Sequence, residues 1–168
     1  PHAGYIYSGP IAAHSYAALY RNGYPESFVI LGPNHTGMGS FVATTDVTFE
    51  TPLGDVEVDG ELMRAMLGGI IDNDFDAHWQ EHSIEVQLPF LQYPGKPFKF
   101  VPICLGMQDW KTSHDVGMTV AKAVKELGDI GEAAAKFMGK KSQVTLFQEP
   151  LTVPKVYDTL DKIARASG

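Results

Sequence analysis

The chain has 168 residues, 44% of them hydrophobic, which suits one soluble domain with a sizeable core. Its formal net charge of −7 argues against a general nucleic-acid-binding protein, whose surface is usually basic. The single cysteine, Cys104, excludes an internal disulfide and favours a reducing, cytoplasmic compartment, and no apolar run is long enough to cross a membrane.

Up to residue 128 the sequence alternates between helical and strand patterns. Apolar residues recur at helical spacing over 10–20, and 27–31 is a short apolar run typical of a buried parallel strand. Polar and apolar residues alternate around Thr-Pro-Leu-Gly at 51–54, which predicts a hairpin. Asp59 can cap a helix over 60–70, and a strand at 98–105 precedes an amphipathic helix at 113–127. This alternation predicts an α/β fold, with a mostly parallel sheet and helices on both faces.

The pattern changes in the last part of the chain. Residues 130–138 are alanine-rich, 143–147 form a brief apolar stretch, and Thr152 can cap a helix that runs to residue 166. The alternation of strands and helices does not continue here. We therefore expect an α/β domain over 1–128 followed by a short all-helical segment over 129–168. The apolar faces of this segment need a partner, which makes self-association an option.

Two histidines lie in motifs framed by glycine and proline, as is typical of strand ends. His2 is in Pro-His-Ala-Gly-Tyr at 1–5, and His35 is in Gly-Pro-Asn-His at 32–35. In an open α/β sheet, ligands bind beyond the carboxyl ends of the strands. Two neutral imidazoles there make half of a non-haem metal site. The motifs predict that His2 and His35 share a site at neighbouring strand ends, although a histidine taken alone is more often a hydrogen-bonded structural residue.

A third motif, Glu-His-Ser-Ile-Glu at 81–85, begins a segment in which apolar residues alternate as far as residue 90. This alternation predicts a strand or extended segment. His82 is a candidate general acid/base or ligand, and Glu81 could orient it or bind directly. The alternative is a solvated Glu–His pair at a strand entrance. Four remaining candidates are predicted to be structural: His14, His78, His114 and Cys104. Of these, Cys104 is expected to be a buried, inert thiol.

These motifs, with Thr-Pro-Leu-Gly between the second and third, occur in the same order as in the Memo family, also called AmmeMemoRadiSam system protein B. The chain resembles that family over residues 1–128. The resemblance implies the fold of the class III extradiol dioxygenases, an α/β sandwich that holds a non-haem iron between strand ends. It implies that His2 and His35 are metal ligands and that His82 is a pocket residue beside them. Together with the Glu-His pair itself, this makes His82 and Glu81 the candidate catalytic residues. The resemblance also implies iron or copper as the metal, and a small molecule of unknown identity as the partner.

The sequence departs from the family pattern. It lacks the family's strand before residue 1, its Ser-Ser-Asp-Phe-x-His stretch, and its late Cys-Gly motif, which supplies a third metal ligand. Cys104 lies in a different context and does not replace that ligand. Because the chain begins with Pro inside a motif, we expect it to be truncated at its start. We therefore expect an incomplete site with weak metal binding, and we leave open whether the chain is an enzyme.

The last part of the chain carries a second resemblance. Residues 128–133, 143–147 and 150–160 are similar to the N-terminal DNA-binding domain of archaeal ATP-dependent DNA ligases. The adenylated-lysine motif of those ligases does not occur. Under this alternative the chain is a DNA-binding module, with Lys140, Lys141 and Lys155 as phosphate contacts. Such cations more often belong to a solvated helix face, so DNA is a partner only under this alternative.

Overall fold

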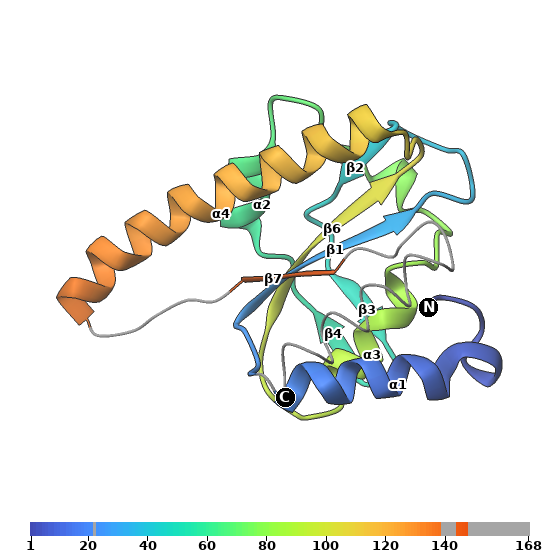
Figure 1. Cartoon of the computed structure of the whole chain (residues 1–168). Helices are drawn as coiled ribbons and strands as arrows, with labels where there is room; N and C mark the ends of the chain where they lie inside the picture. Colours follow the sequence, from blue (N-terminus) through green and yellow to red (C-terminus); the bar gives the residue numbers. More distant parts are fainter. Residues whose placement is uncertain (22, 139–143, 148–168) are drawn as a thin grey trace.

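The computed structural model describes residues 1–21, 23–138 and 144–147 (Figure 1). No helix among them has both the length and the apolar character needed to cross a membrane. In chain order the elements are α1 Tyr5–Arg21, β1 Ser27–Pro33, β2 Val42–Thr44, β3 Phe49–Thr51, β4 Gly54–Val56, α2 Gly60–Met66, β5 Asp72–Asn73, a 3-10 turn Phe75–Ala77, a second 3-10 turn Glu85–Gln87, α3 Leu88–Gln92, β6 Lys99–Leu105, α4 Trp110–Met138 and β7 Val144–Phe147.

A mainly parallel sheet forms the centre of the fold, as the sequence predicts. Its strand order is β5-β2-β6-β1-β7. β1 pairs in parallel with both β6 and β7, and β2 pairs in parallel with β5. Only the β2–β6 pair is antiparallel in the described part of this sheet. β3 and β4 form a separate antiparallel hairpin, which confirms the hairpin predicted around residues 51–54.

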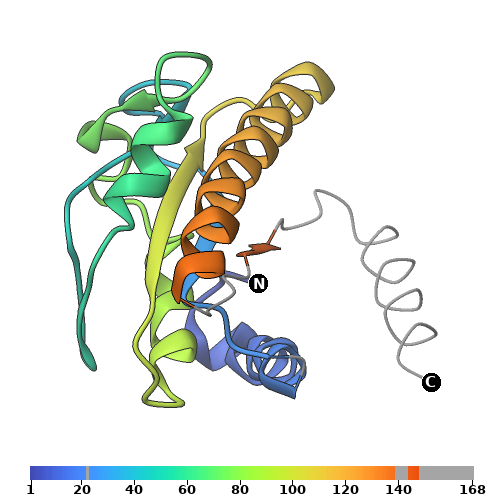
Figure 2. The same cartoon turned by 90° about the vertical axis from the view of Figure 1, so that its left-hand side faces the viewer.

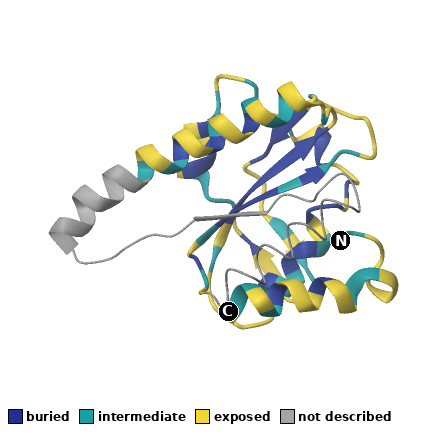
Figure 3. Cartoon of the chain, viewed as in Figure 1, coloured by how far each residue is buried: buried dark blue, intermediate teal, exposed yellow. Residues whose placement is uncertain are grey.

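Helices cover both faces of the sheet (Figures 1 and 2). Successive side chains along a strand point to opposite faces of the sheet, so β1 and β6 contribute residues to a core on each face. The buried residues lie mainly on the strands and on the inward sides of the helices (Figure 3). One core joins β1 and β6 to α2 and α4 through Val29, Val101, Ile103, Leu62, Met66, Val116 and Val120. The other joins them to α1 and α3 through Phe28, Ile30, Phe100, Ala12, Tyr16, Leu88 and Leu91.

Asp59 caps α2, as its position before the helical pattern predicts. Its carboxylate accepts a hydrogen bond from the Leu62 backbone N–H at 3.0 Å and another from the Ser27 hydroxyl at 2.5 Å. We expect Asp59→Ala to lower the free energy of unfolding by about 1 kcal/mol, because the helix loses its N-cap. Urea denaturation measures this. Asp55→Ala, at an exposed position of β4, is the control, and equal effects of the two changes would mean that the cap contributes nothing.

The predicted extended segment at 81–90 is wrong. Residues Glu85–Gln87 form a 3-10 turn, and Leu88–Gln92 form α3. The buried apolar residues are Ile84, Leu88 and Leu91, which are spaced by four and three positions as on a helix. The apolar alternation in the sequence shares Ile84 and Leu88 with this helical face, so periodicity alone did not separate the two structures.

The all-helical prediction for 129–168 is wrong at β7, where Val144–Phe147 pairs in parallel with β1. In addition, α4 is one helix over Trp110–Met138, where the sequence predicted separate helices on either side of residue 128. The predicted helix that begins at Thr152 lies outside the described residues. The division into two domains at residue 128 stays a prediction.

Candidate metal centre

β1 carries His35 to the carboxyl edge of the sheet, as predicted. His35 lies two residues beyond the end of the strand. The Asn34 backbone N–H donates to the Leu105 carbonyl at 2.9 Å and so continues the pairing of β1 with β6. The Asn34 side-chain oxygen then accepts from the backbone N–H groups of Thr36 and Gly37 at 3.0 and 2.9 Å. Asn34 therefore builds the loop that presents His35, a role that the sequence did not reveal.

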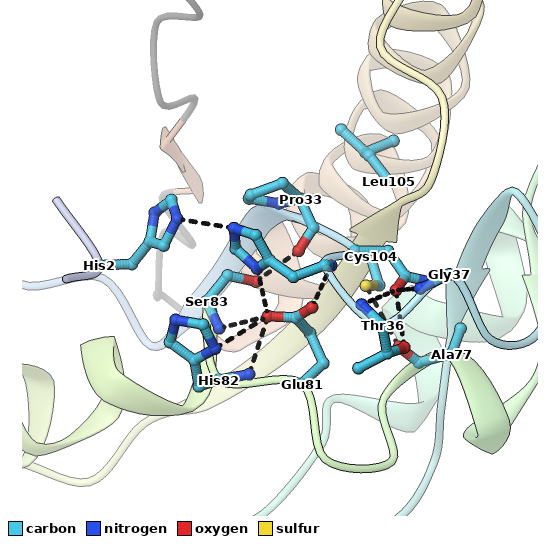
Figure 4. Close-up of polar contacts among 12 residues, drawn as sticks. His2, Pro33, Thr36, Gly37, Ala77, Glu81, His82, Ser83, Cys104 and Leu105 are labelled. Atoms are coloured by element: carbon cyan, nitrogen blue, oxygen red, sulfur yellow. Dashed lines mark hydrogen bonds and ion pairs between the residues drawn. The ribbon is translucent and has the colours of Figure 1, made fainter. Parts of the chain in front are cut away.

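Glu81 is a buried carboxylate at the centre of the site, with a side chain only 2% exposed. It accepts from the ring Nδ1 of His35 at 2.9 Å, and from the backbone N–H groups of His82 at 2.8 Å, Ser83 at 2.9 Å and His35 (Figure 4). Burial acts to raise the pKa of Glu81, but the hydrogen bonds from His35 and Ser83 outweigh it and lower that pKa to about 2. The carboxylate is therefore ionised at neutral pH.

The segment that carries Glu81 packs directly on the end of β1. The Ser83 hydroxyl donates to the Pro33 carbonyl at 2.8 Å. The contact is so close that a Cβ at Gly32 would lie 2.5 Å from Ser83 Oγ and 2.8 Å from Ile84 Cγ1. Only glycine fits at this position without displacing the segment. Sequence reasoning missed both Gly32 and Ser83, whose only signal was that they lie inside the motifs.

His2 lies in the stretch ahead of α1, with its Nε2 atom 3.3 Å from the Nε2 atom of His35. Gln87 positions this stretch, because its amide donates to the Pro1 carbonyl at 3.1 Å while its oxygen accepts from the Tyr16 hydroxyl at 2.8 Å. His2 stands ahead of the first element of the described chain, so the strand end expected before it stays a prediction, whereas the one before His35 is present. The structure nevertheless brings the two imidazoles together.

His82 completes a cluster of three imidazoles. Its ring is stacked on that of His35 at a centroid distance of 4.9 Å, and its centroid lies 5.8 Å from that of His2. His35, Glu81 and His82 form a group that could hold a metal ion, with ligand atoms within 4.8 Å of one another. The alternative of a solvated Glu–His pair is wrong for Glu81. Of the two side chains, that of His82 is substantially exposed and that of Glu81 is buried.

Of the four candidates predicted to be structural, two are buried, as a structural role requires: His78 and Cys104. His78 is buried, with Nε2 3.2 Å from a backbone carbonyl of β2, and burial lowers its pKa. Cys104 is buried in β6, and burial raises the pKa of its thiol to about 12, which makes the thiol unreactive. His14 and His114 are exposed, on α1 and α4.

A family model described as "Memo-like protein" matches residues 1–134. The chain belongs to the Memo family. MEMO1 family proteins of Methanopyrus kandleri and Methanococcoides burtonii are 55% and 57% identical to it over 76% of this chain, and over 46% and 48% of their own lengths. A MEMO1 family protein of Methanosarcina acetivorans is 47% identical over 95% of this chain and 63% of its own length. This Memo-family chain thus spans about half the length of most curated relatives it matches.

A second model, described as "DNA ligase N terminus", matches residues 105–168 and overlaps the Memo match over 105–134. The similarity to a ligase expected for the last part of the chain is therefore present. The DNA-binding alternative is not favoured, because the three clustered histidines all lie within the Memo match. Its candidate phosphate contacts, Lys140, Lys141 and Lys155, lie outside the described residues.

Proposed function

We propose that this Memo-family chain binds a non-haem metal ion, iron or copper, between His2 and His35, on a fold related to the class III extradiol dioxygenases. The observation that carries the proposal is the 3.3 Å separation of the two Nε2 atoms. Two imidazole nitrogens that share one ion at about 2.1 Å lie roughly 3.0–3.4 Å apart in octahedral or tetrahedral coordination. The two nitrogens are therefore already at the separation that a shared ion requires, and imidazole is a ligand that suits both iron and copper.

The chemistry of such a site follows from its small number of protein ligands. When bound, the ion would supply open coordination positions and Lewis acidity toward a small molecule. His82 is the candidate general acid/base, since its ring lies beside both ligands and is 52% exposed at the side chain, so it can exchange protons with solvent. Two histidines seldom hold these ions tightly, so we expect binding that a chelator easily reverses.

Calorimetric titration of chelator-treated protein with Cu(II), or with Fe(II) without oxygen, tests the proposal. Binding should weaken in acidic solution, because a protonated imidazole has no lone pair to give the ion. His2→Ala/His35→Ala should abolish binding. His14→Ala/His114→Ala removes two exposed histidines outside the cluster and should leave binding intact. Unchanged binding in the first double variant would place the metal elsewhere.

A further inference from the structure

We propose that Glu81 is a positioning residue, whose carboxylate holds His35 as the Nδ1–H tautomer and so directs the Nε2 lone pair of His35 toward His2. This inference rests on the proposed function in taking His2 and His35 as the ligand pair. It differs from the roles expected for Glu81 from the sequence, which were to orient His82 or to bind the metal directly. Its basis is the set of hydrogen bonds that the buried carboxylate accepts.

The tautomer follows from the contact between Glu81 and His35. The Glu81 Oε1 atom lies 2.9 Å from Nδ1 of His35. Three backbone N–H groups, those of His35, His82 and Ser83, also point at this carboxylate, which marks it as a hydrogen-bond acceptor. The proton in its contact with His35 therefore belongs to Nδ1. A neutral imidazole carries one ring proton, which leaves Nε2 with a lone pair. That Nε2 is the atom that faces His2 at 3.3 Å.

The same hydrogen bonds make Glu81 a poor metal ligand. Its Oε1 accepts from the His35 ring and from the backbone N–H groups of His82 and Ser83, and its Oε2 accepts from the His35 backbone. A carboxylate has about four lone-pair sites, so these donors leave little capacity for an ion. The alternative ligand group of His35, Glu81 and His82 would use this occupied carboxylate. The His2–His35 pair uses nitrogens that are not engaged with Glu81.

The backbone around Glu81 fixes its direction. Gln80 has a φ of +60°, a left-handed conformation that is uncommon for a residue with a side chain. On the other side, Ser83 is tied to the Pro33 carbonyl at the end of β1. Glu81 therefore points into the protein while the adjacent His82 stays half exposed. This turn and the bond from Ser83 place the carboxylate beside His35 without any contribution from a metal.

Long-range ¹H–¹⁵N NMR spectra of metal-free protein labelled in histidine give the first test. The measurement is made well above pH 6.5, about the ordinary pKa of histidine, so that the rings are neutral. The His35 signal is identified by its loss in His35→Ala, and the exposed His14 serves as the internal reference. We expect His35 as the Nδ1–H tautomer. A wild-type spectrum with His35 as the Nε2–H tautomer would overturn the proposal.

Glu81→Gln gives the second test. It keeps the shape of the side chain but sets an amide N–H against one of the N–H donors that surround it. We expect a mixture of His35 tautomers and a Cu(II) affinity lowered about 10–100-fold, as for other groups that orient a ligand histidine. The matched control is Glu85→Gln, at an exposed position, which should change neither.

The outcomes separate the two proposals. If Glu81→Gln keeps both the single tautomer and the wild-type affinity, the positioning role is wrong. If Glu81→Gln does not fold, the wild-type spectrum still decides. If the Nδ1–H tautomer is found but His2→Ala/His35→Ala binds copper as before, the role of Glu81 toward His35 stands and the metal site is wrong.

Discussion

Gly39→Ala should destabilise the chain much more than Gly37→Ala, although both glycines have a φ of +70°. Left-handed backbone costs a residue with a Cβ about 1–2 kcal/mol, and both variants incur that cost. A Cβ at Gly37 meets nothing within 4 Å, whereas one at Gly39 would lie 2.5 Å from the backbone nitrogen of Ala77. Because a backbone atom cannot rotate away, Gly39→Ala should lose roughly 1–3 kcal/mol more through overpacking.

Urea denaturation of the two variants isolates that contact, because the backbone strain is the same in both. The loop that holds Gly39 is also tied to the Phe75–Ala77 turn by Ser40, whose backbone N–H and hydroxyl donate to Asp74 at 2.7 and 2.9 Å. Gly39→Ala should therefore also loosen the loop that begins at His35, while Gly37→Ala should not. Equal destabilisation by the two changes would contradict the close approach to Ala77.

Local patterns predicted the central architecture well. The apolar run in β1, the alternation around the hairpin and the cap at Asp59 depend on residues close together in the sequence, where periodicity and capping rules apply. The Gly-Pro-Asn-His motif also placed His35 correctly, because a motif directly behind a buried strand lies at that strand's carboxyl end. The patterns predicted the wrong structure around Leu88, where the same apolar residues fit both the alternation of a strand and the spacing of a helix.

The internal order of the site could not be predicted in this way, because it depends on contacts between distant segments. The Ser83 hydroxyl meets the Pro33 carbonyl across 50 positions, and Glu81 meets His35 across 46. The sequence indicates that these residues can bind a metal or transfer a proton. It does not give the distances between them, and it does not show which hydrogen bonds a carboxylate accepts. The strand β7 was missed for a similar reason, since its partner β1 is far away in the sequence.

Gly32→Ala should disrupt the site without changing any residue that bears its chemistry. The new Cβ would lie 2.5 Å from Ser83 Oγ and 2.8 Å from Ile84 Cγ1. To fit it, the segment that carries Glu81 must move away from β1, which breaks the hydrogen bond from Ser83 to Pro33 and draws the carboxylate from His35. We expect a loss of about 1–3 kcal/mol in unfolding free energy from overpacking. Cu(II) affinity should fall about 10–100-fold, since His35 loses the group that orients it.

Gly106→Ala is the matched control, one residue beyond the end of the neighbouring strand β6. A Cβ there comes no closer than 3.4 Å to the Phe41 backbone, so we expect a change within about 0.5 kcal/mol and unaltered copper binding. The double variant Gly32→Ala/Glu81→Gln extends the test. Residues that act through one contact are not additive, so the double variant should bind copper about as weakly as Glu81→Gln alone. Additive losses would mean that Gly32 supports the histidines by a route that does not pass through Glu81.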